Sequence, residues 1–418
     1  MKRSVWTLVV LMLASPAWAA KKLTVEQLKD LLVSLQRDRK TDTEVAAELK
    51  QVELSEELTR SAMNSLVSYV SGPFATEQIY VLEARSAMLP PPASDLPATP
   101  ATDAAEQNAI LDKAVDYVTK SYAQLPPLTA SKTTLRFQDN VEAVAGGGLH
   151  SAGAAVDANR VQASQFVHYI NSTEAPVEMQ SGIEKLSTAK DKTPWGRNGM
   201  IALLGQSPVL TNVLEEAQSS GKINWLRWET VNGKQAAVYA FSVNKKNSHY
   251  AVNDCCFPDV EQTGAIHIQQ QMANGSPSGS SSEGSGNFQT AASWINFKAT
   301  VPYHGELFVD SATGIVLRLI LQAEFKASDQ VQQEDRRIDY GPVMVGGKAL
   351  VLPVKTVVTT VVAPNGDPSA AGSATRRTLF TSEYKNYQSG SPIAILRSHA
   401  AEWLFPQRVP SDWSSSLG

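Results

Sequence analysis

Three titratable residues alternate along one stretch of the chain: His304, Glu306 and Asp310. On a β-strand this spacing places the side chains on one face, where an imidazole and two carboxyl groups can bind a metal or transfer protons. The following strand places three more polar side chains on that face: Arg318, Gln322 and Glu324. Cross-strand pairing on a solvent-exposed face explains all of them, so we predict no metal site and no catalytic residue here.

Two short motifs resemble catalytic signatures. Ser187–Lys190 reads STAK, the S-x-x-K pattern in which a lysine takes the proton of a nucleophilic serine, but the companion S-D-N and K-T-G motifs are missing from the sequence. Gly341–Lys348 reads GPVMVGGK, yet its spacing differs from that of a phosphate loop and it joins two strands. We therefore expect a polar turn and a β-hairpin, respectively, and no cofactor.

Cys255 and Cys256 are the only cysteines, and they are adjacent. In an oxidising compartment they can form a vicinal disulfide, pair between chains, or remain buried thiols. A zinc site needs more ligands than the neighbourhood offers, because only His249 and His267 are close in sequence.

The segment Tyr303–Phe325 predicts a β-hairpin with one apolar face, since two alternating runs flank the polar turn DSATG. The face can pack as ordinary core or line a cavity for a hydrophobic ligand. The residues that would contact such a ligand are Leu307, Val309, Leu317, Leu319 and Leu321.

The N-terminus has the features of a secretory signal. Two basic residues precede the apolar run Val5–Leu13, and Ala17–Ala19 reads AWA, which predicts a signal peptide at 1–19. We expect a protein exported to the periplasm or the extracellular space, without a transmembrane segment. A formal net charge of −4, which includes Lys2 and Arg3 of the signal, disfavours nucleic acid as a partner.

The remaining elements imply an α+β fold. Helical periodicity precedes a Pro/Ala-rich linker, and several long strands follow, with turn signals at Asn232-Gly233 and Gly346-Gly347. We predict a small helical bundle, then a large, curved, half-barrel-like antiparallel sheet with covering helices. The predicted boundaries are 23–89 for the helical domain, 90–103 for the linker, 104–388 for the sheet domain with a disordered Gly/Ser loop at 275–287, and 389–418 for a C-terminal tail.

Four segments carry a resemblance in their order along the chain: QLPPLTASKTTLRF, INWLRWETVNGKQAAVYAFSV, YHGELFVDSATGIVLRLILQAEF and DYGPVMVGGKALVLPVKTVV. Over residues 104–388 they resemble an uncharacterised family of exported bacterial proteins. More distantly, the architecture is similar to the periplasmic lipoprotein carriers (LolA/LolB-like). That resemblance implies an open half-barrel that cups an acyl chain beneath its helices.

The sequence therefore predicts a non-enzymatic exported protein that binds a hydrophobic ligand or a lipoprotein in its curved sheet. The helical domain would dock an envelope protein partner. The alternative is a structural or interaction protein of the cell envelope with no small-molecule site, in which the apolar hairpin face is sealed by the protein's own side chains.

Overall fold

The computed structural model describes residues 21–139, 167–180, 182–185, 202–203, 209–258, 294–362 and 377–390. The expected signal peptide, the STAK motif, the Gly/Ser-rich loop and the tail from residue 391 onward lie outside these residues. No helix in the described ranges is long and apolar enough to cross a membrane.

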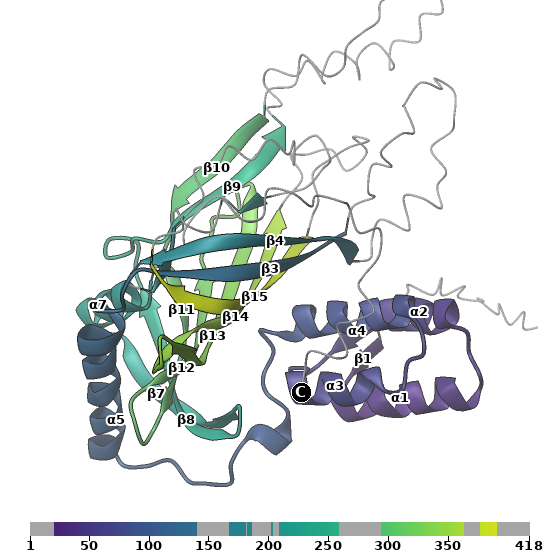
Figure 1. Ribbon diagram of the computed structural model, residues 1–418, viewed down its shortest axis with the longest axis horizontal. Coiled ribbons are helices and arrows are strands. Elements are labelled where there is room, and N and C mark those ends of the chain that lie inside the picture. The colour runs from purple at the N-terminus through teal and green to yellow at the C-terminus, as the bar shows by residue number, and fades with distance from the viewer. Residues whose placement is uncertain are drawn as a thin grey trace, which may run out of the picture.

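Helices dominate the N-terminal region, as predicted, but they do not form a simple bundle (Figure 1). Thr24 and Thr41 begin the first two helices with capping boxes, in which each side chain accepts a hydrogen bond from the backbone three residues later. Between two of these helices, Val52–Leu54 forms a strand parallel to Lys21–Leu23, with its two apolar side chains buried. The elements are β1 (Lys21–Leu23), α1 (Val25–Arg37), α2 (Asp42–Lys50), β2 (Val52–Leu54), α3 (Arg60–Val67) and α4 (Pro73–Ser86).

The described strands after the linker confirm the predicted large antiparallel sheet. Ten strands pair in the order β5-β4-β3-β15-β14-β13-β12-β11-β8-β7, and the two end strands do not pair with each other, so the sheet is open. A smaller sheet has the order β10-β9-β6. The strands are β3 (Leu128–Gln138), β4 (His168–Gln180), β5 (Ile183–Glu184), β6 (Ala202–Leu203), β7 (Ile223–Val231), β8 (Lys234–Val243), β9 (Ala251–Pro258), β10 (Trp294–Thr300), β11 (Tyr303–Asp310), β12 (Val316–Ala323), β13 (Val331–Val345), β14 (Lys348–Val362) and β15 (Arg377–Ser389).

Both predicted glycine turns are present. Asn232 and Gly233 have φ values of 51° and 75° between β7 and β8, and Gly346 and Gly347 have 57° and 80° between β13 and β14. Consecutive left-handed residues give the turn that matches the twist of a two-residue hairpin. The GPVMVGGK motif therefore belongs to a β-hairpin, as expected.

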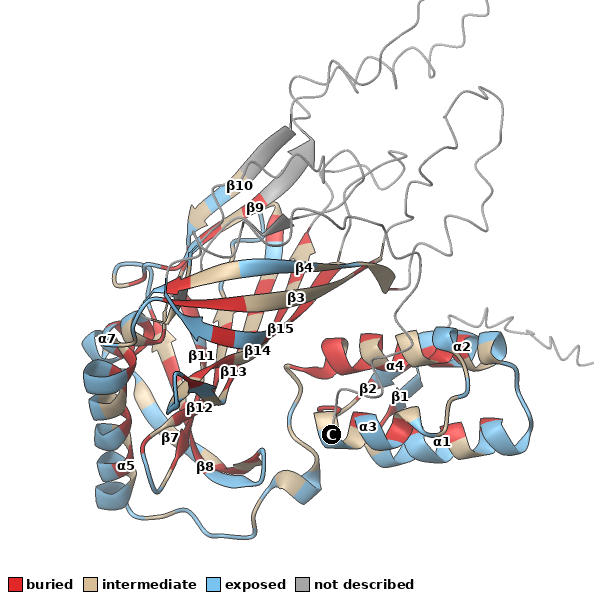
Figure 2. Ribbon diagram, in the orientation of Figure 1, coloured by how far each residue is buried: buried red, intermediate tan, exposed pale blue. Residues whose placement is uncertain are grey.

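One face of the sheet packs against helices from the part of the chain that follows the linker. α5 (Ala104–Tyr117) continues into one π-helical turn, η2 (Val118–Tyr122), and lies with α7 (Leu210–Ser220) beside β7 and β8 (Figure 1). Their apolar side chains join those of β8, β11 and β12 in the largest core cluster. The burial colours of Figure 2 place buried residues on the side of these elements that faces the sheet.

The opposite face of the sheet meets the N-terminal helical region. Val81 and Ala84 of α4 pack against Phe137 of β3 and Leu379 of β15, and all four are buried. Next to this apolar contact, the interface becomes charged. A short connection, with the 3-10 turn η1 (Ala93–Asp95), leads from the helical region past β7 to α5.

Candidate functional site

A cavity of about 210 Å³ lies where the helical region, the linker and the sheet meet, and we call it the interdomain cavity. The turn between β7 and β8 forms one wall, and strands β12 to β14 supply charged side chains. Its acidic lining residues are Glu57, Glu83, Asp95, Glu229 and Asp339. Its basic lining residues are Arg60, Arg318, Arg337 and Lys355. Because these side chains come from segments far apart in sequence, the cavity exists only in the docked arrangement.

The first group of ions joins the loop before α3 to the middle of the sheet. Arg318 and Asp339 are cross-strand neighbours, with Nε and Oδ1 2.7 Å apart. Glu57 accepts hydrogen bonds from Arg337 Nη1 at 2.6 Å and from Arg318 Nη1 at 3.3 Å. These four side chains are at most 10% exposed, so little solvent screens their charges. Burial favours the neutral acid at Asp339, but Arg318 and Arg337 outweigh it and hold the Asp339 pKa well below its usual range.

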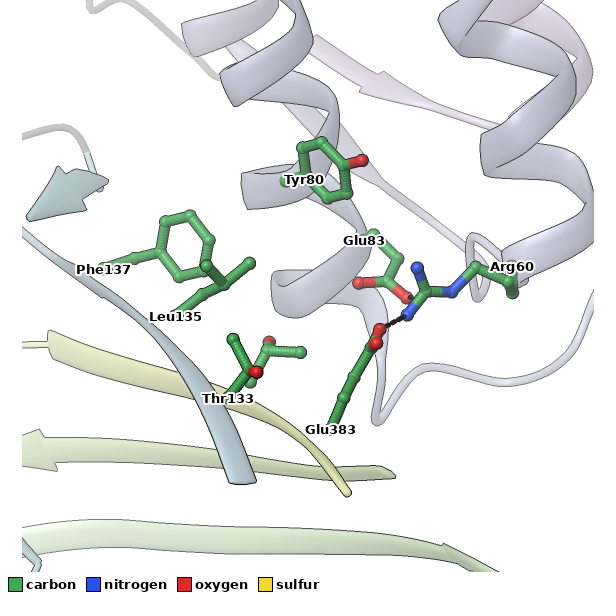
Figure 3. Close-up of a pocket in the computed structure, with 8 residues that line it drawn as sticks. Arg60, Tyr80, Glu83, Thr133, Leu135, Phe137 and Glu383 are labelled. Carbon is green, nitrogen blue, oxygen red and sulfur yellow. Dashed lines mark hydrogen bonds and ion pairs between the residues drawn. The ribbon is translucent and has the colours of Figure 1, made fainter. Parts of the chain in front are cut away.

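The second group of ions lies between α4 and β15, and Figure 3 draws three of its members, Arg60, Glu83 and Glu383. Arg60 pairs with Glu383, Lys355 pairs with Glu83, and Arg60 Nε lies 3.9 Å from Glu83 Oε1. Arg60 opposes the effect of burial on Glu383, so the pKa of this carboxyl is lowered. Beside the group is a cavity of about 10 Å³, room for roughly one water molecule. Tyr80 lines it from α4, as Figure 3 shows.

Two further acids line the linker and hairpin side of the interdomain cavity. Glu229 accepts hydrogen bonds from Arg227 Nε at 3.0 Å and Nη2 at 2.7 Å and lies 3.7 Å from Arg318 Nη1, and Arg227 also binds Glu306. Asp95 makes no ion pair within the described residues, and its carboxylate accepts only a 3.4 Å hydrogen bond from the Ser94 hydroxyl. Burial raises the pKa of Asp95, and burial also raises the pKa of Glu229 despite the nearby Arg227. Asp95 is therefore the one acid of this lining that has no ion pair among the described residues.

The five residues predicted to contact a hydrophobic ligand are all buried. Leu307, Val309, Leu319 and Leu321 are at most 1% exposed and belong to the core cluster beneath α5 and α7. Leu317 belongs to a different cluster, with Val231, Val238 and Phe308. The register explains this separation: Phe308 pairs with Arg318 and Val309 pairs with Val316, so a bulge shifts the alternation at position 317. The described pockets do not include any of the five.

The polar face of the same hairpin is only partly exposed to solvent, and the prediction of a solvent-exposed face was wrong for Arg318. His304 pairs with Glu324 at 3.0 Å, as expected for a cross-strand contact on a surface. Asp310 pairs with Lys234 at 3.2 Å but is itself buried, so the prediction was wrong for this residue as well. Arg318, however, is 6% exposed, because the helical region brings Glu57 over it. The described residues contain no cluster of three or more His, Cys, Asp or Glu side chains able to hold a metal.

The predicted alternatives for Cys255 and Cys256, a vicinal disulfide, pairing between chains or buried thiols, concern side chains that lie outside the described part of the structure. The backbones of Cys255 and Cys256 belong to β9, where Cys255 pairs with Ala202.

Sequence reasoning missed the charged interface, although one signal was present. β13 contains the run Glu334–Asp339, EDRRID, in which charged residues occupy both faces of one strand. A central strand with charges on both faces predicts a charged partner on each face, because an unpaired buried charge is costly. Nothing in the sequence identifies Glu57 as that partner, since it lies 280 residues from Arg337.

No family model matches this sequence, and no curated protein or solved structure matches it either. Function is therefore inferred from the interdomain cavity and the residues that line it.

Proposed function

We propose that this protein is a non-enzymatic exported binding protein whose ligand site is the interdomain cavity. The observation that carries the proposal is the convergence of charged side chains from the helical region, the linker and the sheet on one cavity of about 210 Å³. Ligand sites are concave and contain a few polar groups that fix the orientation of the ligand. A site between two domains also lets ligand binding be coupled to domain closure.

The lining favours binding over catalysis. The described lining has no histidine, cysteine or tyrosine, and its arginines and Lys355 are all paired with carboxylates. Paired ions hold fixed charges toward a ligand, whereas acid–base catalysis needs a group whose proton is free to move near neutral pH. The arrangement suits recognition of a charged or polar group.

A hydrophobic ligand or lipoprotein held by a curved, half-barrel-like sheet is our second candidate. What favours it is the position of α5, η2 and α7 over the apolar face of an open sheet, the arrangement that the carrier resemblance implies. Because Leu319 and Leu321 are fully buried, such a ligand would enter only if these helices moved away from the sheet. The π-helical turn η2 is a point where that movement can begin, since π turns often mark functional sites.

The test is to fill the cavity with a bulky side chain and to ask whether a ligand that copurifies with the wild type is lost. The full-length chain, exported by the expression host and purified without detergent, is analysed by native mass spectrometry beside two variants of α3. Ser61→Trp fills the cavity from its lining, and Ser65→Trp, one turn further on the same helix and also exposed, is the matched control. The proposal predicts a non-covalent mass in the wild type and in Ser65→Trp that is lost in Ser61→Trp.

The other outcomes identify the alternatives. A lipid-sized mass that both tryptophan variants retain, and that Leu319→Ala weakens, favours the sheet interior. If no mass copurifies and a metabolite panel leaves the melting temperature unchanged, the binding proposal is wrong. An interaction protein of the envelope without a small-molecule site would then be favoured, with the helical region docking a protein partner.

A further inference from the structure

We propose that a hard metal cation of the Ca²⁺ kind binds between the small sheet and the large sheet, coordinated by Asp254, Glu334 and Thr360. The site lies on the face of the large sheet that packs against α5 and α7, which we call its inner face. None of the three residues lines the interdomain cavity, so this inference is independent of the proposed function.

The register of the two sheets brings the three side chains together. Asp254 of β9 is the direct partner of Phe297 on β10, so both side chains point to the same side of the small sheet. Phe297 packs against a buried valine pair from β13 and β14, which includes Val362. Two residues before it on the same strand, and therefore on the same face, is Thr360, the direct partner of Glu334 on β13. Asp254 thus points toward the Glu334–Thr360 pair, and the charge of Glu334 acts on its carboxyl group.

Several buried oxygen atoms at this place have no hydrogen-bond partner. Asp254 is 0% exposed, and neither of its carboxylate oxygens is hydrogen-bonded within the described residues. The same holds for the hydroxyl of Thr360, which is 1% exposed, and for that of Thr378, its neighbour on β15. Buried polar atoms are nearly always paired in folded proteins, so a group of unpaired ones points to an ion or a water that completes it.

The charges around Asp254 favour an ion over a water. Among the described residues, Glu334 and Arg336 are the charged groups that act on Asp254. The Oε1 atom of Glu334 accepts hydrogen bonds from Arg336 Nη2 at 3.2 Å and from the Tyr250 hydroxyl at 2.7 Å. Two carboxyl groups therefore face one guanidinium, and burial and Glu334 together raise the Asp254 pKa against the opposing effect of Arg336. Arg336 Nε is unpaired as well, but the unpaired oxygens outnumber it.

A single hard cation can serve all of these oxygens. Ca²⁺ binds about six to eight oxygen atoms in flexible geometry, and a carboxylate can offer it one oxygen or both. A proton on Asp254 would remove that charge but would leave the Thr360 hydroxyl unpaired. Mg²⁺ fits less well, because it keeps several bound waters and these oxygens are sealed from solvent. With two carboxylates and hydroxyls as its ligands, the site differs from a cluster of three or more His, Cys, Asp or Glu side chains.

The test is Ca²⁺ binding to the full chain after bound metals have been removed with EDTA. Isothermal titration calorimetry at pH 7 should give one Ca²⁺ per chain, bound at least about tenfold more tightly than Mg²⁺. Asp254→Asn should weaken Ca²⁺ binding by at least about tenfold, since even groups that only orient a metal ligand contribute that much. The matched control is Asp335→Asn, a buried aspartate next to Glu334 but on the opposite face of β13, which should leave the affinity unchanged.

Two further readouts separate a metal ligand from a residue that only stabilises the fold. Ca²⁺ must displace the proton that the raised pKa of Asp254 retains, so the binding enthalpy should depend on the ionisation enthalpy of the buffer. That dependence should disappear in Asp254→Asn. Thr360→Val removes only a hydroxyl and should weaken Ca²⁺ binding by about threefold or more. Thr381→Val removes a buried hydroxyl from the opposite face of the sheet and should have no effect.

The outcomes that overturn the inference are distinct from those that bear on the interdomain cavity. If Ca²⁺ does not bind, or binds equally well to the wild type and Asp254→Asn, the site is not a metal site. Tighter binding of Mg²⁺ than of Ca²⁺ also overturns the assignment. Asp254→Asn should fold in EDTA at least as well as the wild type, because it loses an uncompensated buried acid, and Thr360→Val decides the question if it does not. The mass measured with Ser61→Trp decides the proposed function in either case.

Discussion

Replacing Glu57 by glutamine should loosen the helical region from the sheet. The Glu57 carboxylate is buried and binds Arg337 Nη1 at 2.6 Å and Arg318 Nη1 at 3.3 Å. Glutamine keeps the shape but removes the charge, so the two buried guanidinium groups are left with the carboxylate of Asp339 and, 3.7 Å from Arg318, that of Glu229, which already binds Arg227. Breaking a buried ion pair by removing one partner costs about 3–5 kcal/mol, because the remaining charge stays desolvated. We expect a loss near the lower figure, since the amide oxygen still accepts one hydrogen bond.

The assay combines equilibrium urea unfolding with limited proteolysis. Detachment of the helical region should produce a first unfolding transition at lower urea and faster cleavage within residues 90–103. Glu53→Gln is the matched control, because Glu53 pairs with Arg85 at 3.0 Å while its side chain is 50% exposed. That pair should contribute about 0–1 kcal/mol. If the two substitutions lower the free energy of unfolding equally, within about 0.5 kcal/mol, the buried ion pairs of Glu57 do not hold the helical region on the sheet.

Three further perturbations test the packing and the buried charges by urea unfolding. Leu319→Ala should lower the free energy of unfolding by about 2–5 kcal/mol because Leu319 is fully buried, whereas Leu226→Ala, at a residue 45% exposed, should cost under about 1 kcal/mol. Asp254→Asn should increase stability at pH 7 by about 1 kcal/mol or more, because burial raises the Asp254 pKa and its carboxylate accepts no hydrogen bond within the described residues. This gain should disappear by about pH 3, below the ordinary Asp pKa, where the wild-type acid is mostly protonated in both states, and a gain that persists there would contradict the reasoning. The folded-state pKa of Asp339 is depressed, so this carboxylate stabilises the fold above about pH 4 and that stabilisation is lost as the pH falls. Asp339→Asn should therefore be less stable than the wild type at pH 7. Between pH 5 and pH 3 its free energy of unfolding should fall by less than that of the wild type.

The sequence by itself determined the elements whose signals are local. Thr24 begins α1, the Asn232-Gly233 turn joins β7 to β8, and a long antiparallel sheet follows the helices. Capping bonds and left-handed turn residues act within a few positions of the chain, so their physics is visible in the sequence. The same reasoning placed the apolar residues of β11 and β12 on one face, except where the bulge at Leu317 moved a side chain to the other face.

Tertiary structure alone decided what covers each face of the sheet. The parallel pairing of β2 with β1, the burial of Arg318 and the contact between Glu57 and Arg337 all depend on segments that are distant in sequence. A charged side chain on a strand has the same sequence pattern whether water or a second domain lies above it. The cavity and the buried ion pairs that line it arise only when the helical region and the linker dock on the sheet, because docking removes the solvent that would otherwise screen those charges.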